Sequence, residues 1–237
     1  LSIGFEHYMH AEAKGWVLYL EGSTDAAILE RLAKRLGHAA LSYLSAAYVD
    51  YVDTNDPRLP QSRFHALREA VPQLRGVALF DRLQRELPQD QYLRLACWRK
   101  REIENYVCSE EALLAWASAD GRFEQSEDLV EQAQSPVRRE AMEKAIHDTV
   151  MALEMLGKPS PWGEDLKVSE EFLEPVFSAY HRYLGLPESL MRKKQFYELA
   201  DFIPLEEIDD EVTEKLDLIL EVAKNAGDTQ AGRTDLR

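Results

Sequence analysis

The stretch that decides the fold is Gly15-Trp16-Val17-Leu18-Tyr19-Leu20-Glu21-Gly22-Ser23-Thr24-Asp25. Its first half is a short run of aromatic and branched apolar residues, which favours a buried β-strand. The run stops at Glu21 and Gly22, and apolar residues at helical spacing follow until Gly37. This order predicts a strand, then a turn that carries an acidic residue, then a helix.

The same pattern returns twice. Residues 76–80 are a second buried-strand candidate that ends at Asp81, and a third candidate, residues 92–98, leads into two further acids. Strands that alternate with helical stretches predict a parallel sheet, and such sheets collect ligands outside the carboxyl ends of their strands. The acids expected along this one edge are Glu21, Asp81, Glu102 and Glu104.

From Ser109 onward the pattern changes, and nearly every segment has helical periodicity. We therefore expect an α/β domain over residues 1–108 and an all-α helical region over residues 109–226. In that region Ser169 is expected to cap a helix. The polar residues 227–237 are expected to be a disordered or vector-derived tail.

The charge of the chain limits how it can meet nucleic acid. It has 237 residues, with 28 Lys and Arg against 43 Asp and Glu, for a net charge of -15. Non-specific affinity for phosphates comes from Lys and Arg, so this balance counts against a generic nucleic-acid binder. Acidic clusters that bind divalent cations can still act on DNA, because the cation offsets the phosphate charge.

The location of the protein is predicted from two absences in the sequence. No apolar run reaches the roughly 20 residues of a membrane span, and residues 1–7 lack a secretion signal. We expect a cytoplasmic protein with no membrane partner. The missing initiator Met predicts that the natural chain begins upstream.

Carboxylates gathered at one edge repel each other, and hard cations such as Mg²⁺ or Mn²⁺ neutralise them through oxygen coordination. Two such ions can hold the attacking and leaving oxygens of a phosphodiester substitution. The alternative interpretation is that these acids are turn residues or complement helix N-termini. Because Glu102 and Glu104 point apart if they lie on a helix, only one of them is then expected to be a direct ligand. The candidate metal ligands are Glu21, Asp25, Asp81, Glu102 and Glu104.

Three segments carry a resemblance to a known family. Leu18-Tyr19-Leu20-Glu21-Gly22-Ser23-Thr24-Asp25 resembles the strand, Glu-Gly turn and downstream Asp of Toprim domains, and Ala78-Leu79-Phe80-Asp81-Arg82 resembles the strand of their second acidic motif. Arg101-Glu102-Ile103-Glu104-Asn105-Tyr106 is similar to a segment of the overcoming-lysogenization-defect (OLD) nucleases and related ATPase-coupled defence nucleases. The resemblance covers about residues 15–106.

The resemblance implies a Toprim fold, which is a Rossmann-like parallel sheet flanked by helices. It implies a divalent-metal-dependent DNA endonuclease of phage defence that uses Mg²⁺ or Mn²⁺, with a two-metal site. It also implies an N-terminal ABC-type ATPase domain upstream, through which homo-oligomers could form. ATP is not expected to bind these residues, since they contain no phosphate loop of the Gly-x-x-x-x-Gly-Lys-Ser/Thr type.

A basic segment late in the chain resembles the same family, and one position of the second acidic motif differs from it. Met191-Arg192-Lys193-Lys194-Gln195-Phe196-Tyr197-Glu198-Leu199 resembles the lysine-bearing segment of OLD-type catalytic regions. Lys193 fits it best and Lys194 remains an alternative, and either could stabilise a phosphate transition state beside the catalytic acids Glu21 and Asp81. The family motif is Asp-x-Asp, but this chain has Asp81-Arg82-Leu83, so Leu83 occupies the place of the second Asp and the number of metal ions stays open.

Two other functions fit the same sequence. One is a catalytically inactive Toprim module for assembly or regulation, which Leu83 favours. The other is a Mg²⁺-dependent α/β domain that binds a phosphorylated ligand, since acids at strand ends can also hold a cation for a small molecule.

Overall fold

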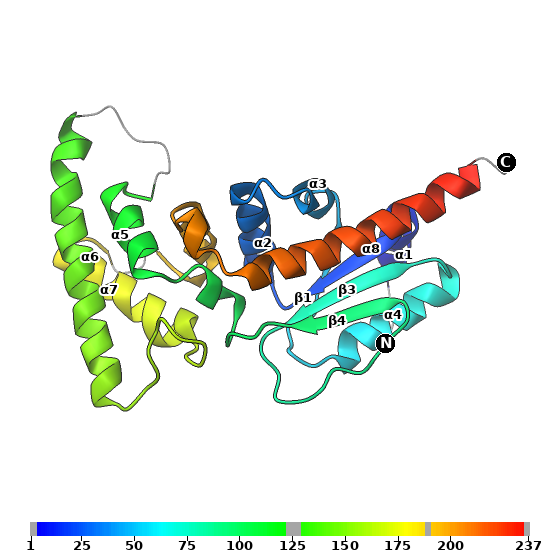
Figure 1. The fold of residues 1–237 in the computed structure, drawn as a ribbon, viewed down its shortest axis with the longest axis horizontal. Helices are drawn as coiled ribbons and strands as arrows, with labels where there is room; N and C mark the ends of the chain where they lie inside the picture. Colours follow the sequence, from blue (N-terminus) through cyan, green and yellow to red (C-terminus); the bar gives the residue numbers. More distant parts are fainter. Residues whose placement is uncertain (1–3, 122–128, 188–190, 235–237) are drawn as a thin grey trace. The chain divides into compact units, whose positions relative to one another are not determined.

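The structure is a computed structural model that describes residues 4–121, 129–187 and 191–234 (Figure 1). The chain forms two compact units, one of residues Leu1–Trp98 with Asp210–Arg237 and one of Arg99–Asp209. Among the described residues, no helix combines the length and the apolar character needed to cross a membrane.

The first unit is built on a four-stranded sheet in which every pair of neighbouring strands is parallel. The strands are β1 (Trp16–Leu20), β2 (Tyr48–Tyr51), β3 (Arg75–Phe80) and β4 (Leu93–Cys97), in the order β2-β1-β3-β4. The predicted α/β class and parallel sheet are confirmed, as are the three predicted strands. Strand β2 was not predicted, because four residues that include Asp50 lack the apolar run that reveals the others.

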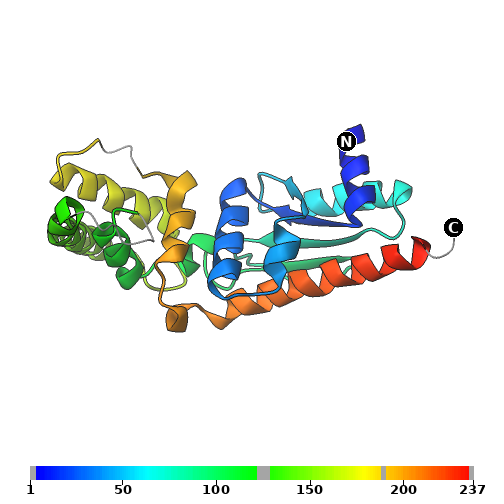
Figure 2. The same ribbon diagram turned by 90° about the horizontal axis from the view of Figure 1, so that it is seen from above.

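Helices cover both faces of this sheet. They are α1 (Phe5–Lys14) and α4 (Arg58–Ala70) on one face, and α2 (Ser23–Arg35), α3 (Ala40–Leu44) and α8 (Asp210–Thr234) on the other. Figure 2 shows α8 along the face opposite to α1 and α4. Side chains alternate along a strand, so Val17 and Tyr19 pack under α4 while Leu18 and Leu20 face the other layer. Burial on both faces explains why the two central strands, β1 and β3, are nearly continuous apolar runs.

One glycine shows how closely α4 approaches the sheet. A Cβ added to Gly76 of β3 would come within 2.9 Å of the Phe64 ring and 2.8 Å of the Leu93 side chain. Any larger residue at this position would have to displace the Phe64 ring or the Leu93 side chain, so the glycine permits the close packing of α4 on β3.

The division into units differs from the expected one. Helix α8 was expected in a separate helical region, but it contacts β1 and β3, and its apolar stripe is buried at Val212, Leu216 and Ile219. The last helix therefore returns to the sheet. Helix α8 continues through Thr234 and so includes part of the segment expected to be a disordered or vector-derived tail. Residues 235–237 lie outside the described part of the chain.

The second unit is helical, and its described residues contain no strand, in agreement with the predicted periodicity. Its elements are η1 (Ile103–Tyr106), α5 (Glu110–Ser118), α6 (Leu129–Met155), η2 (Ser169–Leu173), α7 (Glu174–Tyr183), η3 (Lys193–Asp201) and η4 (Leu205–Glu207). Helix α6 packs against both α5 and α7. Buried aromatic residues join α5, α7 and η3, as in the edge-to-face contact of Trp116 with Phe177 and the stacking of Phe177 on Phe196.

Candidate functional site

Glu21 and Asp81 follow directly after two neighbouring strands. Tyr19 of β1 is paired with Ala78 of β3, and continuing this parallel register brings Glu21 opposite Phe80, one residue before Asp81. Both acids are partly exposed, whereas the strands that precede them are buried. The predicted convergence of these two acids at the carboxyl edge of the sheet therefore agrees with the strand order and register.

The topology gives this pair of strand ends a special position. After β1 the chain enters α2 on one face, whereas the connection after β3 packs Leu83 and Leu87 against the core on the opposite face. Neighbouring strands that send the chain to opposite faces define a topological switch point, which is where open α/β sheets bind their ligands. Glu21 and Asp81 lie at the switch point of this sheet.

Leu83 has a structural role in that connection. Its side chain is partly buried and packs against the core cluster between the sheet, α1 and α4. A carboxylate at this position would be desolvated by the same contacts, and its ionised form would be destabilised. The packing explains why an apolar residue occupies the position where a second acid was expected.

A segment that sequence reasoning missed joins the two acidic strand ends. After β2, the backbone N–H of Asp53 donates to the carbonyl of Glu21 at 3.0 Å, and the side-chain Nδ2 of Asn55 donates to the carbonyl of Asp81 at 3.4 Å. The polar run of residues 53–56 after a Tyr-Val-Asp-Tyr strand was the available signal. This run gains a defined place only because the preceding residues form β2.

An ion-pair group fixes the far end of this segment. Asp56 accepts from Nε of Arg58 at 2.8 Å and from Nη2 of Arg85 at 2.9 Å, so it ties the loop after β2 to the loop after β3. Hydrogen bonds from Arg58, followed by the bond from Arg85, hold the pKa of the Asp56 carboxyl well below its usual range. Asp56 is thereby engaged with arginines, which makes it a weaker candidate for holding a metal than its neighbours.

Asp25 lies in the first turn of α2, where a negative charge is favoured by the helix dipole. Burial, followed by the carboxylates of Glu30 and Asp25, raises the pKa of the Tyr51 hydroxyl at the end of β2.

In the described residues, no group of three or more His, Cys, Asp or Glu side chains is arranged to hold a metal ion. Glu21 and Asp81 thus follow neighbouring strands, but the described part of the chain adds no third residue of these types to them.

Glu102 belongs to the second unit and is engaged with protein donors. Its side chain is 1% exposed and accepts from the backbone N–H of Ser169 at 2.6 Å and from its hydroxyl at 3.0 Å. It also caps η1 through a reciprocal arrangement with Asn105. Ser169 was expected to be a helix cap, but Val168 is the residue at that position and Glu102 satisfies the helix N-terminus instead.

Glu104 and Lys193 form a second charged pair in this unit. Glu104 is 2% exposed, and its Oε1 lies 3.9 Å from Nζ of Lys193 at the start of η3. Burial disfavours the charge on Lys193, but the nearby carboxylates of Glu104 and Glu102 outweigh it and raise the lysine pKa. Lys194 is exposed on the same short helix. Of the two lysines, Lys193 therefore lies against the acidic pair and remains charged.

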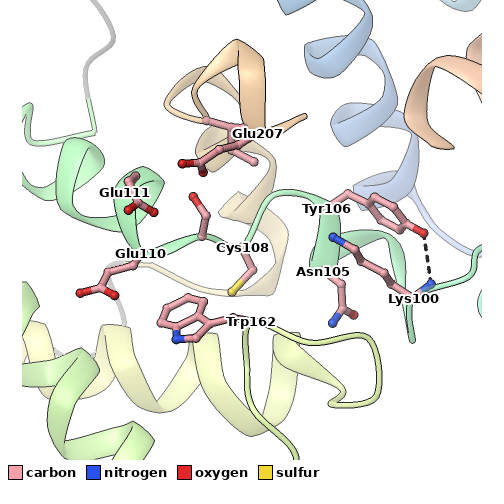
Figure 3. A pocket seen from close by; sticks show the side chains of 10 residues that line it. Lys100, Asn105, Tyr106, Cys108, Glu110, Glu111, Trp162 and Glu207 are labelled. Carbon is pink, nitrogen blue, oxygen red and sulfur yellow. Dashed lines mark hydrogen bonds between the residues drawn. The ribbon is translucent and has the colours of Figure 1, made fainter. Parts of the chain in front are cut away.

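The second unit also contains a pocket of about 330 Å³ (Figure 3). Its lining combines carboxylates, one lysine, one thiol and aromatic rings. The residues are Lys100, Asn105, Tyr106, Cys108, Ser109, Glu110, Glu111, Trp162, Ile203 and Glu207. Burial raises the pKa of the Cys108 thiol and so disfavours its reactive thiolate form. Asn105 already donates to the carbonyls of Gly163 and Leu166, so it shapes the pocket wall.

The predicted site residues thus fall into two groups. Glu21, Asp25 and Asp81 belong to the first unit, and Glu102, Glu104, Lys193 and Lys194 belong to the second. No family model matches the chain, and no match is found among curated proteins or among solved structures.

Proposed function

We propose that the chain is the catalytic region of an ATPase-coupled OLD-type nuclease, which hydrolyses phosphodiester bonds of DNA with a divalent metal. In this proposal the first unit is a Toprim domain. The main support is the placement of Glu21 and Asp81 after the two neighbouring strands β1 and β3, at the switch point of a parallel sheet. The strand order explains why two acids that are far apart in sequence follow neighbouring strands.

The donor chemistry at this edge suits Mg²⁺ or Mn²⁺. Both ions prefer oxygen ligands, and Glu21 and Asp81 offer carboxylates that are partly exposed and can be reached by an ion. Such an ion supplies charge compensation at the phosphate and acidifies a bound water. Leu83 takes the place of the second carboxylate of the family motif, so the number of bound ions is part of what we propose to test.

The second unit supports the proposal through one cation. A lysine that stabilises a phosphate transition state must be protonated, and the raised pKa of Lys193 beside Glu104 and Glu102 keeps it so at neutral pH. A DNA-binding ATPase partner would supply the phosphate contacts that a chain of net charge -15 lacks.

A cleavage assay tests the proposed activity. The 237-residue chain is incubated with plasmid DNA and Mn²⁺ or Mg²⁺ at low salt, together with Glu21→Ala and, as a matched control, Glu69→Ala. Glu69 is an exposed acid on α4 away from the strand ends. We expect cleavage by the wild type and the control and none by Glu21→Ala. Equal cleavage by Glu21→Ala and wild type would overturn the assigned site.

One observation favours a second candidate, a non-catalytic Toprim module for assembly or regulation. Leu83 packs against the core, so the position of the second acid in the family motif has a packing role here. This candidate predicts that the folded wild-type chain cleaves no DNA with either metal, even in the presence of the ATPase partner. Cleavage that depends on Glu21 would exclude it.

A further inference from the structure

We propose that Asn55 supplies an additional oxygen ligand to the divalent cation held by Glu21 and Asp81, in place of the carboxylate lost at Leu83. This inference rests on the proposed metal site and names a ligand that the acidic motifs do not contain. Carboxamide oxygens are ordinary ligands of hard cations, so the residue type is suitable.

The first support is the path of the chain. Strand β2 lies beside β1 and is separated from β3 by it, yet Asn55 reaches the carbonyl of Asp81 after β3. On the way, Asp53 donates to the carbonyl of Glu21 after β1. The segment after β2 therefore crosses the carboxyl end of β1 and contacts the backbone of both acidic residues.

The second support is the orientation of the Asn55 carboxamide. Its Nδ2 faces the carbonyl of Asp81, and only the nitrogen of the group can donate to a carbonyl. Oδ1, on the same planar group, is therefore held close to Asp81. Among the described residues, no donor satisfies this buried oxygen. A buried acceptor without a partner costs free energy, and a cation or a water carried by it removes that cost.

The third support is that this segment is held in place. Asp53 has φ of 49°, in the left-handed region that few non-glycine residues adopt. On the other side of Asn55, Asp56 is bound by Arg58 and Arg85. A residue in a sparsely populated conformation persists only where its surroundings fix it, and such residues gather at binding sites. Both flanks thus fix the position from which Asn55 presents its oxygen.

Calorimetric titration of the metal-free chain with Mn²⁺ alone tests the proposal. Asn55→Ala removes the oxygen and should weaken Mn²⁺ binding by about 10-fold or more. Asn55→Asp keeps an oxygen and loses the donor to Asp81, so it should bind Mn²⁺ at least as tightly as the wild type. Asn225→Asp, on the exposed side of α8, adds the same charge elsewhere and should leave the affinity unchanged.

The variants separate the possible failures. If Asn55→Asp binds as weakly as Asn55→Ala, the role of Asn55 lies in its bond to Asp81 and the proposal is overturned. It is also overturned if Asn55→Ala binds like the wild type while Glu21→Ala and Asp81→Ala lose binding, and in that case the metal site itself stands. If the wild type takes up no Mn²⁺, both the inference and the proposed metal-dependent function fail. Metal-free melting of each variant checks that a weakened affinity does not arise from unfolding.

Discussion

The two groups of acidic residues differ in how far their side chains are buried. Glu21 and Asp81 are partly exposed and follow strands whose own hydrogen bonds are completed within the sheet. Glu102 and Glu104 are almost completely buried, and both oxygens of Glu102 accept from Ser169. Carboxylates with similar sequence context thus have different chemistry available to them.

This difference in burial indicates different roles for acidic residues that looked equivalent in the sequence. A carboxylate that already accepts several hydrogen bonds is a fixed part of the protein, because releasing it to bind a ligand would leave buried donors unsatisfied. Glu102 is therefore a structural residue first. Glu104, beside Lys193, is the better candidate of the pair for a functional role. The expectation that only one of the two acts directly remains a prediction, and this contrast favours Glu104.

The largest effect should come from Asp81→Ala at the exposed edge. Loss of this proposed metal ligand should reduce DNA cleavage by about 100-fold or more, because an electrostatic contribution to the transition state is removed. The side chain is partly exposed, so the melting temperature should change little. Single-turnover cleavage and thermal melting check the two halves. A folded Asp81→Ala variant with full activity would contradict the assignment.

Glu102→Ala should show the opposite behaviour, with its main effect on stability. Ser169 and the N-terminus of η1 would lose a buried, charged acceptor, at a cost of about 3 kcal/mol in the free energy of unfolding. Urea denaturation measures this change, and Glu164→Ala, an exposed acid in the same unit, is the control. If Glu102→Ala were as stable as the control, the contrast drawn between the two acidic groups would be wrong.

A smaller effect, on turnover, is expected from Lys193→Ala. If this cation stabilises the transition state, the variant should lower single-turnover cleavage by about 10-fold while DNA affinity changes less. Lys194→Ala, at an exposed neighbouring position, is the matched control and should have little effect on either quantity. A loss confined to affinity would make Lys193 a phosphate anchor, and a loss in Lys194→Ala alone would transfer the role to that residue.

The smallest effect is expected from Asp90. Like Glu102, it accepts hydrogen bonds from backbone N–H groups, but it lies just before β4. Its Oδ1 accepts from the N–H groups of Tyr92 and Leu93, and its Oδ2 lies 2.7 Å from His65. Burial opposes ionisation, but these hydrogen bonds outweigh it and lower the pKa of Asp90. A lowered folded-state pKa adds stability above the ordinary aspartate value of 3.8, and this stability is lost as the pH falls through the folded-state pKa.

The stability difference between wild type and Asp90→Asn should therefore be present at pH 6 and shrink below about pH 4. Urea denaturation at a series of pH values measures it. Asp217→Asn, an exposed acid on α8 that also contacts a histidine, should show a smaller change over the same pH range. A difference that grows on acidification would mean that Asp90 is not stabilised in its charged form.

The sequence by itself determined the parts of this protein that depend on local pattern. The apolar runs before Glu21 and Asp81 specify two strands that are buried on both faces and are therefore almost wholly apolar. The run of residues 93–97 specifies the third, an edge strand that is only partly buried. The buried stripe of Phe172, Val176 and Tyr180 likewise follows from helical spacing. These features need no knowledge of distant residues.

Only the tertiary structure decided what distant segments do to each other. Ser169, which satisfies Glu102, lies 67 positions later in the chain, and Asn55 reaches Asp81 across 26 positions. Helix α8 covers a sheet whose last strand ends at Cys97. Periodicity shows which side chains are buried but not which partner buries them. A glutamate can therefore be partly exposed after a strand, as Glu21 is, or buried and hydrogen-bonded to a distant hydroxyl, as Glu102 is. Only the packing of the chain distinguishes the two.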